Sequence, residues 1–167
     1  MALLPILQFP DPRLKLVAKQ VDSFDAEIEK ICSDMLETMY ETQGVGLAAT
    51  QVNIQQRILV IDISEDQSQP LCIINPKLIN AQGEIIWEEG CLSFPGVFAK
   101  VKRSAQITIE FYNVKGEPQT LHAEELMAVC IQHEIDHLNG ITFYDHISPL
   151  KQKMLRKKLD KMRDKAL

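Results

Sequence analysis

The sequence lacks any long hydrophobic run. No apolar stretch in its 167 residues approaches the roughly 20 residues of a membrane-spanning helix, so no membrane association is expected. Internal repeats, low-complexity segments and Gly/Ser linkers are also missing. With few aromatic residues and seven glycines, the composition indicates neither a fibre nor a disordered chain. The apolar N-terminus has no basic region before it and is interrupted by Pro5 and Pro10, so we expect no signal peptide.

What is present fits one soluble domain. The chain is 46% hydrophobic and 25% charged, and its length predicts a single domain over residues 1–167. It contains four cysteines: Cys32, Cys72, Cys91 and Cys130. An even number would suggest disulfides in a secreted chain. Without a secretory signal, we interpret them as reduced thiols of a cytoplasmic protein.

The charge is distributed unevenly. Residues 150–167 carry eight Lys/Arg and two Asp, whereas residues 1–149 carry ten Lys/Arg and 21 Asp/Glu. The net charge of −5 therefore combines −11 on the body with +6 on the tail. Such a tail can dock on an anionic partner, and the alternative is a solvated helix face.

Hydrophobic periodicity predicts an α+β fold. Apolar residues recur every three or four positions over residues 25–42 and cover nearly every side of residues 124–139, so the second helix is expected in the interior. Residues 57–63, 71–75, 105–112 and 119–124 have strand patterns. Ser148 and Pro149 open a third, basic helix. We therefore expect antiparallel β-sheets packed around a central helix, with an N-terminal and a C-terminal helix.

The central helix carries the motif HEIDH at residues 133–137. Positions i and i+4 lie on one helix face, so His133 and His137 can bind one metal ion. Glu134, between them, can act on a water that the ion binds. Two ordinary histidines on a helix are the alternative interpretation of the pattern.

A catalytic ion needs a third protein ligand. In metzincins the third ligand is a downstream His, at the position of Phe143 here, and in thermolysin-like enzymes it is a Glu about twenty residues further on. Neither ligand is present, which leaves cysteine as the best remaining donor. Cys130 shares the helix face, but residues 130 to 137 span about 10 Å along the axis, too far for short ligand bonds. A donor from another segment is favoured. Cys91 lies in such a segment, although a buried structural thiol is its default interpretation.

Three motifs, in order, make the chain resemble bacterial peptide deformylases. They are GVGLAATQ at residues 44–51, EGCLS at residues 89–93 and QHEIDHLNG at residues 132–140. The resemblance implies that Cys91, His133 and His137 bind one divalent metal ion. It further implies Fe²⁺ as the physiological ion, with Zn²⁺, Ni²⁺ or Co²⁺ able to substitute.

The resemblance also implies the reaction. Its substrate would be the N-formylmethionine of newly made proteins, and formate would be released. A water activated by the metal would attack the formyl carbonyl, with Glu134 as base and then acid. The side-chain amide of Gln51 and the backbone N–H of Leu92 would stabilise the charge on the formyl oxygen. An exposed loop position is the alternative for Gln51.

A pocket for the methionine side chain is expected beside the metal. Leu126, Val129 and Cys130 precede His133 on the same helix face, and the resemblance places Val45 opposite them. Ordinary core packing is the commoner role of such a stripe. The resemblance also assigns the backbone of Gly46 to peptide binding, whereas the residues alone equally indicate a plain turn.

Two further positions lead to specific expectations. Many relatives carry Arg at the position of Phe98, where it contacts the peptide, so this chain cannot form that contact. Arg103 and Glu89 are hypothesised to form an ion pair that supports the Cys91 loop.

The sequence leaves other roles to be tested. For the basic tail, the resemblance implies a contact with the ribosome. The alternatives are a protease that cuts internal peptide bonds and a non-enzymatic protein with a structural metal, for which His122 and His146 are further donors.

Overall fold

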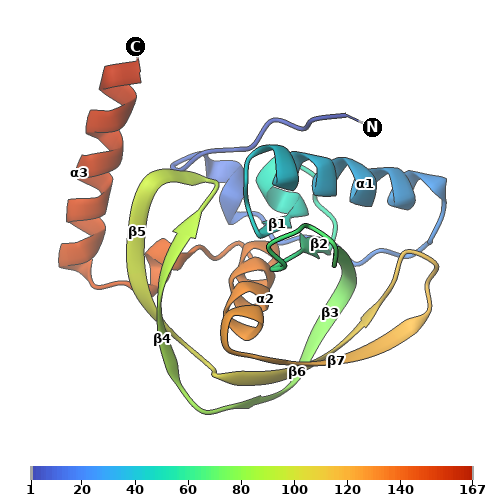
Figure 1. Ribbon diagram of the computed structural model, residues 1–167. Helices are drawn as coiled ribbons and strands as arrows, with labels where there is room; N and C mark the ends of the chain where they lie inside the picture. Colours follow the sequence, from blue (N-terminus) through green and yellow to red (C-terminus); the bar gives the residue numbers. More distant parts are fainter. Residues whose placement is uncertain (1, 167) are drawn as a thin grey trace.

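The computed structural model describes residues 2–166, and Figure 1 shows the arrangement of its helices and strands. The helices are α1 (Ala26–Glu41), α2 (Glu125–Leu138) and α3 (Pro149–Ala166). The strands are β1 (Gly46–Ala48), β2 (Ile58–Ile61), β3 (Leu71–Gln82), β4 (Ile85–Cys91), β5 (Phe94–Arg103), β6 (Gln106–Tyr112) and β7 (Pro118–Glu124).

The strands form two antiparallel sheets. One has the order β1-β2-β3-β6-β7, and the other is the β4–β5 hairpin. Both curve around α2, which contacts β1, β2, β6 and β7 and occupies the centre of Figure 1. The predicted α+β fold is thus confirmed. Short turns join β4 to β5 and β6 to β7, which favours antiparallel pairing, whereas β3 pairs with β6 although the hairpin lies between them in the sequence.

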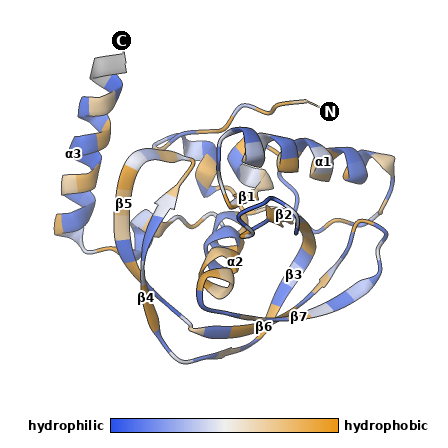
Figure 2. Cartoon of the chain, in the orientation of Figure 1, coloured by the Kyte–Doolittle hydropathy of each residue, from blue (hydrophilic) through white to orange (hydrophobic). Residues whose placement is uncertain are grey.

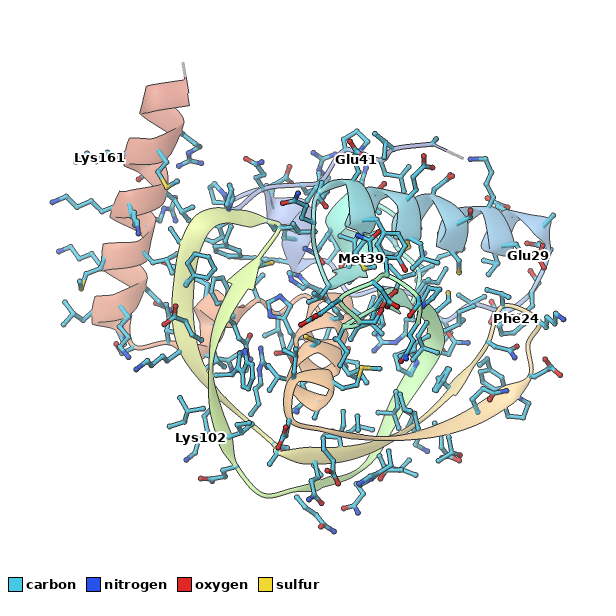
Figure 3. The ribbon with its side chains drawn as sticks, in the orientation of Figure 1. Phe24, Glu29, Met39, Glu41, Lys102 and Lys161 are labelled. Carbon is cyan, nitrogen blue, oxygen red and sulfur yellow. The ribbon has the colours of Figure 1, made fainter. Side chains whose placement is uncertain are left out.

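Helix α1 covers one side of the larger sheet. The side chain of Asp25 accepts a hydrogen bond from the backbone N–H of Ile28 at 3.2 Å and so caps the first turn. Ile28, Met35 and Met39 recur on one face and are buried in a cluster that includes residues of β2. Met39 points from α1 towards the strands in Figure 3. This packing holds the segment after α1, which includes β1, beside α2.

Helix α2 lies in the interior because it has apolar residues on several faces. Ala128, Ile131 and Leu138 are fully buried against strands of the larger sheet. The chain leaves the helix through Gly140, whose φ is +75°, and a Cβ there would lie 2.4 Å from the carbonyl oxygen of Lys15. Only glycine fits that turn. The buried helix therefore brings its polar motif into the core.

Helix α3 packs on the other side of the hairpin. Leu155 and Leu159 are buried in a cluster with residues of β5 and with Phe143. Most of the remaining surface of α3 is hydrophilic, and the helix stands along β5 at the left edge of Figure 2. No helix within residues 2–166 has both the length and the apolar character needed to cross a membrane.

The sequence patterns did not predict the three-residue strand β1, and they underestimated the strands in two further places. The strand predicted at residues 71–75 continues to Gln82. Its second half was not predicted because it is exposed and carries no apolar alternation. The β4–β5 hairpin was not predicted as a unit. Its buried positions pack against α3 and the short helix Phe143–His146 rather than a broad sheet face, so its pattern is irregular.

Candidate metal centre and active site

Three donor atoms from two distant segments meet inside the fold. Helix α2 presents His133 and His137 with their Nε2 atoms 3.3 Å apart. Cys91, the last residue of β4, places its Sγ 3.4 Å from Nε2 of His137. All three donor atoms lie within 4.8 Å of one another, and both imidazoles are buried. The predicted cysteine and histidines are therefore brought together, whereas Cys130 is not part of the cluster.

A buried ion pair orients His133. Nδ1 of His133 lies 2.8 Å from Oε1 of Glu89, and Arg103 donates to both carboxylate oxygens at 2.7 and 2.9 Å. Burial would raise the pKa of Glu89, but the hydrogen bonds from Arg103 and His133 lower it to about 2. An ionised carboxylate only accepts, so Nδ1 of His133 donates. Its Nε2 is thereby directed at the other donors.

This network continues to the surface. Nη1 of Arg103 donates to Asp136 at 2.6 Å, and Nε2 of His146 lies 2.8 Å from the same carboxylate oxygen. The hypothesised pair of Arg103 and Glu89 is thus present, and Arg103 also connects it to α2. The sequence analysis did not select Asp136, although its place inside the HEIDH motif is the signal that could have found it.

The pKa values of the two imidazoles are shifted in opposite directions. Burial and the positive charge of His133 lower the pKa of His137 well below its usual range. Burial would also lower the pKa of His133, but the Cys91 sulfur and the Glu134 carboxylate raise it well above its usual range. His133 therefore holds a proton more readily than His137, and a metal cation bound by the three donors would displace such a proton.

The donor set fits a divalent transition-metal ion. One thiolate and two imidazoles are ligands that such ions accept, and a catalytic site keeps its fourth position open. Within residues 2–166, no other His, Cys, Asp or Glu joins the cluster. His122 lies beside Thr108 on the outer sheet and His146 beside Asp136, so neither supplies the fourth ligand of a closed structural site.

Glu134 lies beside the cluster with one oxygen unused. Its side chain is buried, and its Oε1 has no hydrogen-bond partner among the described residues. Burial raises the pKa of this carboxyl to about 7. A Cβ on Gly46 would lie 2.6 Å from Oε2, so only glycine allows β1 to approach the carboxylate this closely. The orphaned oxygen can accept a hydrogen bond from a water held at the metal position.

Gln51 is buried beside Cys91 rather than exposed at a loop end. Its Oε1 accepts from the backbone N–H of Ala48 at 3.0 Å, and its Nε2 donates to Oγ of Ser93 at 3.1 Å. The same Nε2 lies 3.6 Å from Sγ of Cys91. The amide is therefore held with its donor end towards the cluster. The sequence analysis gave Ser93 no role, although its place at the end of the EGCLS motif is the signal that could have found it.

A cavity of about 480 Å³ opens beside the cluster. The residues predicted to bind substrate, and Leu92, all line it. They are Val45, Gly46, Leu92, Leu126, Val129 and Cys130. Burial raises the pKa of the Cys130 thiol to about 12, so it contributes a neutral wall. Trp87 and Phe98 also line this cavity and add aromatic surface that the periodicity did not identify.

Together with the α+β fold, this arrangement defines a class of protein, the metal-dependent hydrolases with a buried HExxH helix. Comparison with known proteins identifies the family. The sequence model of the family described as polypeptide deformylase matches residues 3–153. The chain belongs to this family.

Named relatives cover nearly its whole length. A peptide deformylase of Pseudoalteromonas translucida (strain TAC 125) is 53% identical over 161 residues, which are 96% of each chain. Peptide deformylase 2 of Xanthomonas axonopodis pv. citri (strain 306) is 51% identical over 166 residues, which are 98% of each chain.

Solved structures agree with this family assignment. The crystal structure of a peptide deformylase from Legionella pneumophila has a TM-score of 0.94 and 44% identity, covering 97% of this chain and 96% of that one. The Ehrlichia chaffeensis enzyme in complex with actinonin has a TM-score of 0.92 and 39% identity, covering 97% and 98%. The predicted enzyme class is thus confirmed: the family removes the N-formyl group from nascent peptides.

Proposed function

We propose that Cys91, His133 and His137 bind one divalent metal ion and that this ion is Fe²⁺ in the cell. The convergence of Sγ and the two Nε2 atoms within 4.8 Å supports the ligand set. Imidazole and thiolate accept several first-row ions, so Zn²⁺, Ni²⁺ and Co²⁺ can substitute. A single catalytic domain in the cytoplasm completes the proposal, consistent with the family match over residues 3–153.

Glu134 is the general base and then the general acid. When bound, the metal lowers the pKa of a water and polarises the formyl carbonyl. Glu134 takes a proton from the water and passes it to the departing amine. In the metal-free site burial raises its pKa to about 7, and a carboxyl that titrates near neutral pH can both accept and return a proton. The unpartnered Oε1 is the atom that receives the proton.

Gln51 and Leu92 stabilise the formyl oxygen as negative charge develops on it. Because Ala48 fixes Oε1 of Gln51, the amide Nε2 stays directed towards the cluster without needing to reorganise. The backbone N–H of Leu92 follows directly after Cys91 and supplies the second donor.

The cavity binds the formylmethionine residue. Val45, Leu126, Val129 and Cys130 line it and receive the apolar methionine side chain, while the backbone of Gly46 pairs with the peptide. The volume of about 480 Å³ is adequate for a side chain and a short stretch of backbone.

The central observation is the meeting of Cys91 with the two histidines. We expect protein loaded anaerobically with Fe²⁺ to hydrolyse formyl-Met-Ala, and an unformylated peptide to remain intact. Glu134→Ala should bind the metal without hydrolysing the substrate. Full activity of that variant would refute the proposed role, and cleavage of internal peptide bonds would support the protease alternative.

The basic helix α3 is proposed to contact ribosomal RNA. Lys153 and Lys157 are exposed on the side of α3 opposite Leu155. Removing residues 153–167 would also remove the buried Leu155 and Leu159, so charge reversal is the cleaner test. Lys153→Glu with Lys157→Glu should reduce ribosome co-sedimentation at low salt, with a smaller difference from wild type at higher salt, while formyl-Met-Ala hydrolysis persists. Equal losses in both assays would refute this contact.

A further inference from the structure

A second groove lies between the hairpin and α3. It has a volume of about 350 Å³ and runs between β5 and the first half of α3. Its apolar surface includes Met154, which is 64% exposed, and the buried Leu155 at its floor. Figure 1 shows α3 standing along β5, and the residues that line the groove come from these two elements and the neighbouring Glu88 and Ile147.

The groove adjoins the catalytic cavity across the β4–β5 hairpin. Glu88, Val97 and Phe98 line both of them. The ring of Phe98 lies over Gly90, since a Cβ there would be 2.7 Å from the ring, and Gly90 directly precedes Cys91. Phe98 is nevertheless 63% exposed. Its ring therefore forms an apolar surface between the cluster and the groove.

The groove carries positive charge on an otherwise acidic body. Lys100, Lys151 and Lys158 line it together with the single carboxylate of Glu88. Lys100 lies opposite Glu88 in the hairpin register, so these two charges offset each other. None of the ion pairs found within residues 2–166 uses the three lysines. Lys151 and Lys158 thus remain available to an acidic ligand.

An exposed aromatic ring, an apolar floor and two lysines that form no ion pair with the described side chains match an extended peptide with apolar and acidic side chains. We propose that this groove binds the part of the formylated substrate that follows its first residues. Apolar side chains would pack on Phe98 and Met154, and acidic ones would lie beside Lys151 and Lys158. This inference rests on the proposed function, because it extends the same substrate beyond the same cavity.

The test compares peptides that differ only in their distal half. Formyl-Met-Ala-Ser is the short reference. Peptides of about ten residues, which span roughly 33 Å when extended, carry an acidic, a neutral or a basic tail after the same start. We expect kcat/KM to be about 3–10-fold higher for the acidic than for the basic tail, through KM, because exposed ion pairs contribute modestly. The difference should shrink as salt screens the charges.

Two matched double variants distinguish charge recognition in the groove from the general electrostatic field of α3. Lys151→Glu with Lys158→Glu should reverse the preference towards the basic tail. Lys153→Glu with Lys157→Glu changes the net charge equally on the opposite side of α3 and should keep the preference for the acidic tail. Each long-peptide value is divided by the value of the same variant on formyl-Met-Ala-Ser, so a general loss of activity cancels.

The outcomes are distinct. If the short peptide is hydrolysed but the tails do not differ, the groove proposal is overturned and the proposed function stands. If both double variants change the preference equally, a diffuse field explains it and the groove does not. If Lys151→Glu with Lys158→Glu lowers only ribosome co-sedimentation, the groove contacts RNA instead. Failure to hydrolyse the short peptide would overturn the proposed function and this inference with it.

Discussion

Replacing Glu89 by Gln tests how the buried ion pair supports the metal centre. The carboxylate accepts two hydrogen bonds from Arg103 and one from His133, and the Glu89 side chain is only 3% exposed. An amide of the same shape can accept on one side only, so a donor of Arg103 or of His133 would lose its partner.

The pKa of Glu89 sets the magnitude and the pH window. Its pKa falls from the ordinary 4.5 to about 2 in the fold. A difference of this size corresponds to about 3 kcal/mol of folding stability at neutral pH, similar to the loss on breaking a buried ion pair. Because the folded pKa is the lower one, this contribution is complete above pH 4.5 and is lost as the pH falls towards 2.

The assay is chemical denaturation of metal-free wild-type protein and Glu89→Gln at several pH values. We expect a difference in unfolding free energy of about 3 kcal/mol at pH 7 that shrinks below pH 4.5. Metal retention against a chelator should also weaken, by about 10–100-fold. The exposed neighbour Glu88→Gln is the control and should shift stability by at most about 0.5 kcal/mol. A difference that is absent at pH 7, or that does not change with pH, would refute the reasoning.

Three other substitutions address the chemistry directly. Glu134→Gln should lower kcat by about 10²–10⁴-fold with metal content unchanged, and a metal-loaded variant of normal kcat would exclude Glu134 as the base. Gln51→Ala should lower kcat by about 10²–10³-fold with a smaller change in KM, as steady-state kinetics on formyl-Met-Ala would report; a change in KM alone would assign Gln51 to substrate binding instead. Gly46→Ala should abolish most activity while the protein stays folded by circular dichroism, because the added Cβ would lie 2.6 Å from Oε2 of Glu134; normal kinetics would show that the carboxylate can move aside at little cost.

Much of the fold could be predicted because its helices carry clear local signals. The capped, periodic segment at residues 25–42 corresponds to α1, and the apolar segment at residues 124–139 corresponds to α2. The hairpin could not be predicted because its buried residues pack against α3 and Phe143, which are distant in sequence. Likewise, the exposed half of β3 is held by pairing with β6 and not by burial.

In the candidate site, too, some residues could be predicted from local spacing and others only from the fold. The spacing of His133 and His137 is a local property of a helix, so the sequence alone predicts that they share a face. Cys91 required the family resemblance, because the 41 residues between Cys91 and His133 carry no signal that its sulfur meets those rings. Of the groups around Arg103, the sequence suggested only Glu89. Asp136 and His146 lie far from it in sequence, and only the fold brings them together.

Metal-edge X-ray absorption of the Fe²⁺-loaded protein tests the central arrangement most directly. We predict one sulfur at about 2.3 Å and nitrogen or oxygen ligands at about 2.0–2.2 Å around each ion, with the sulfur signal lost in Cys91→Ser and kept in Cys130→Ser. An ion without a sulfur ligand, or a sulfur signal that survives Cys91→Ser, would contradict the account.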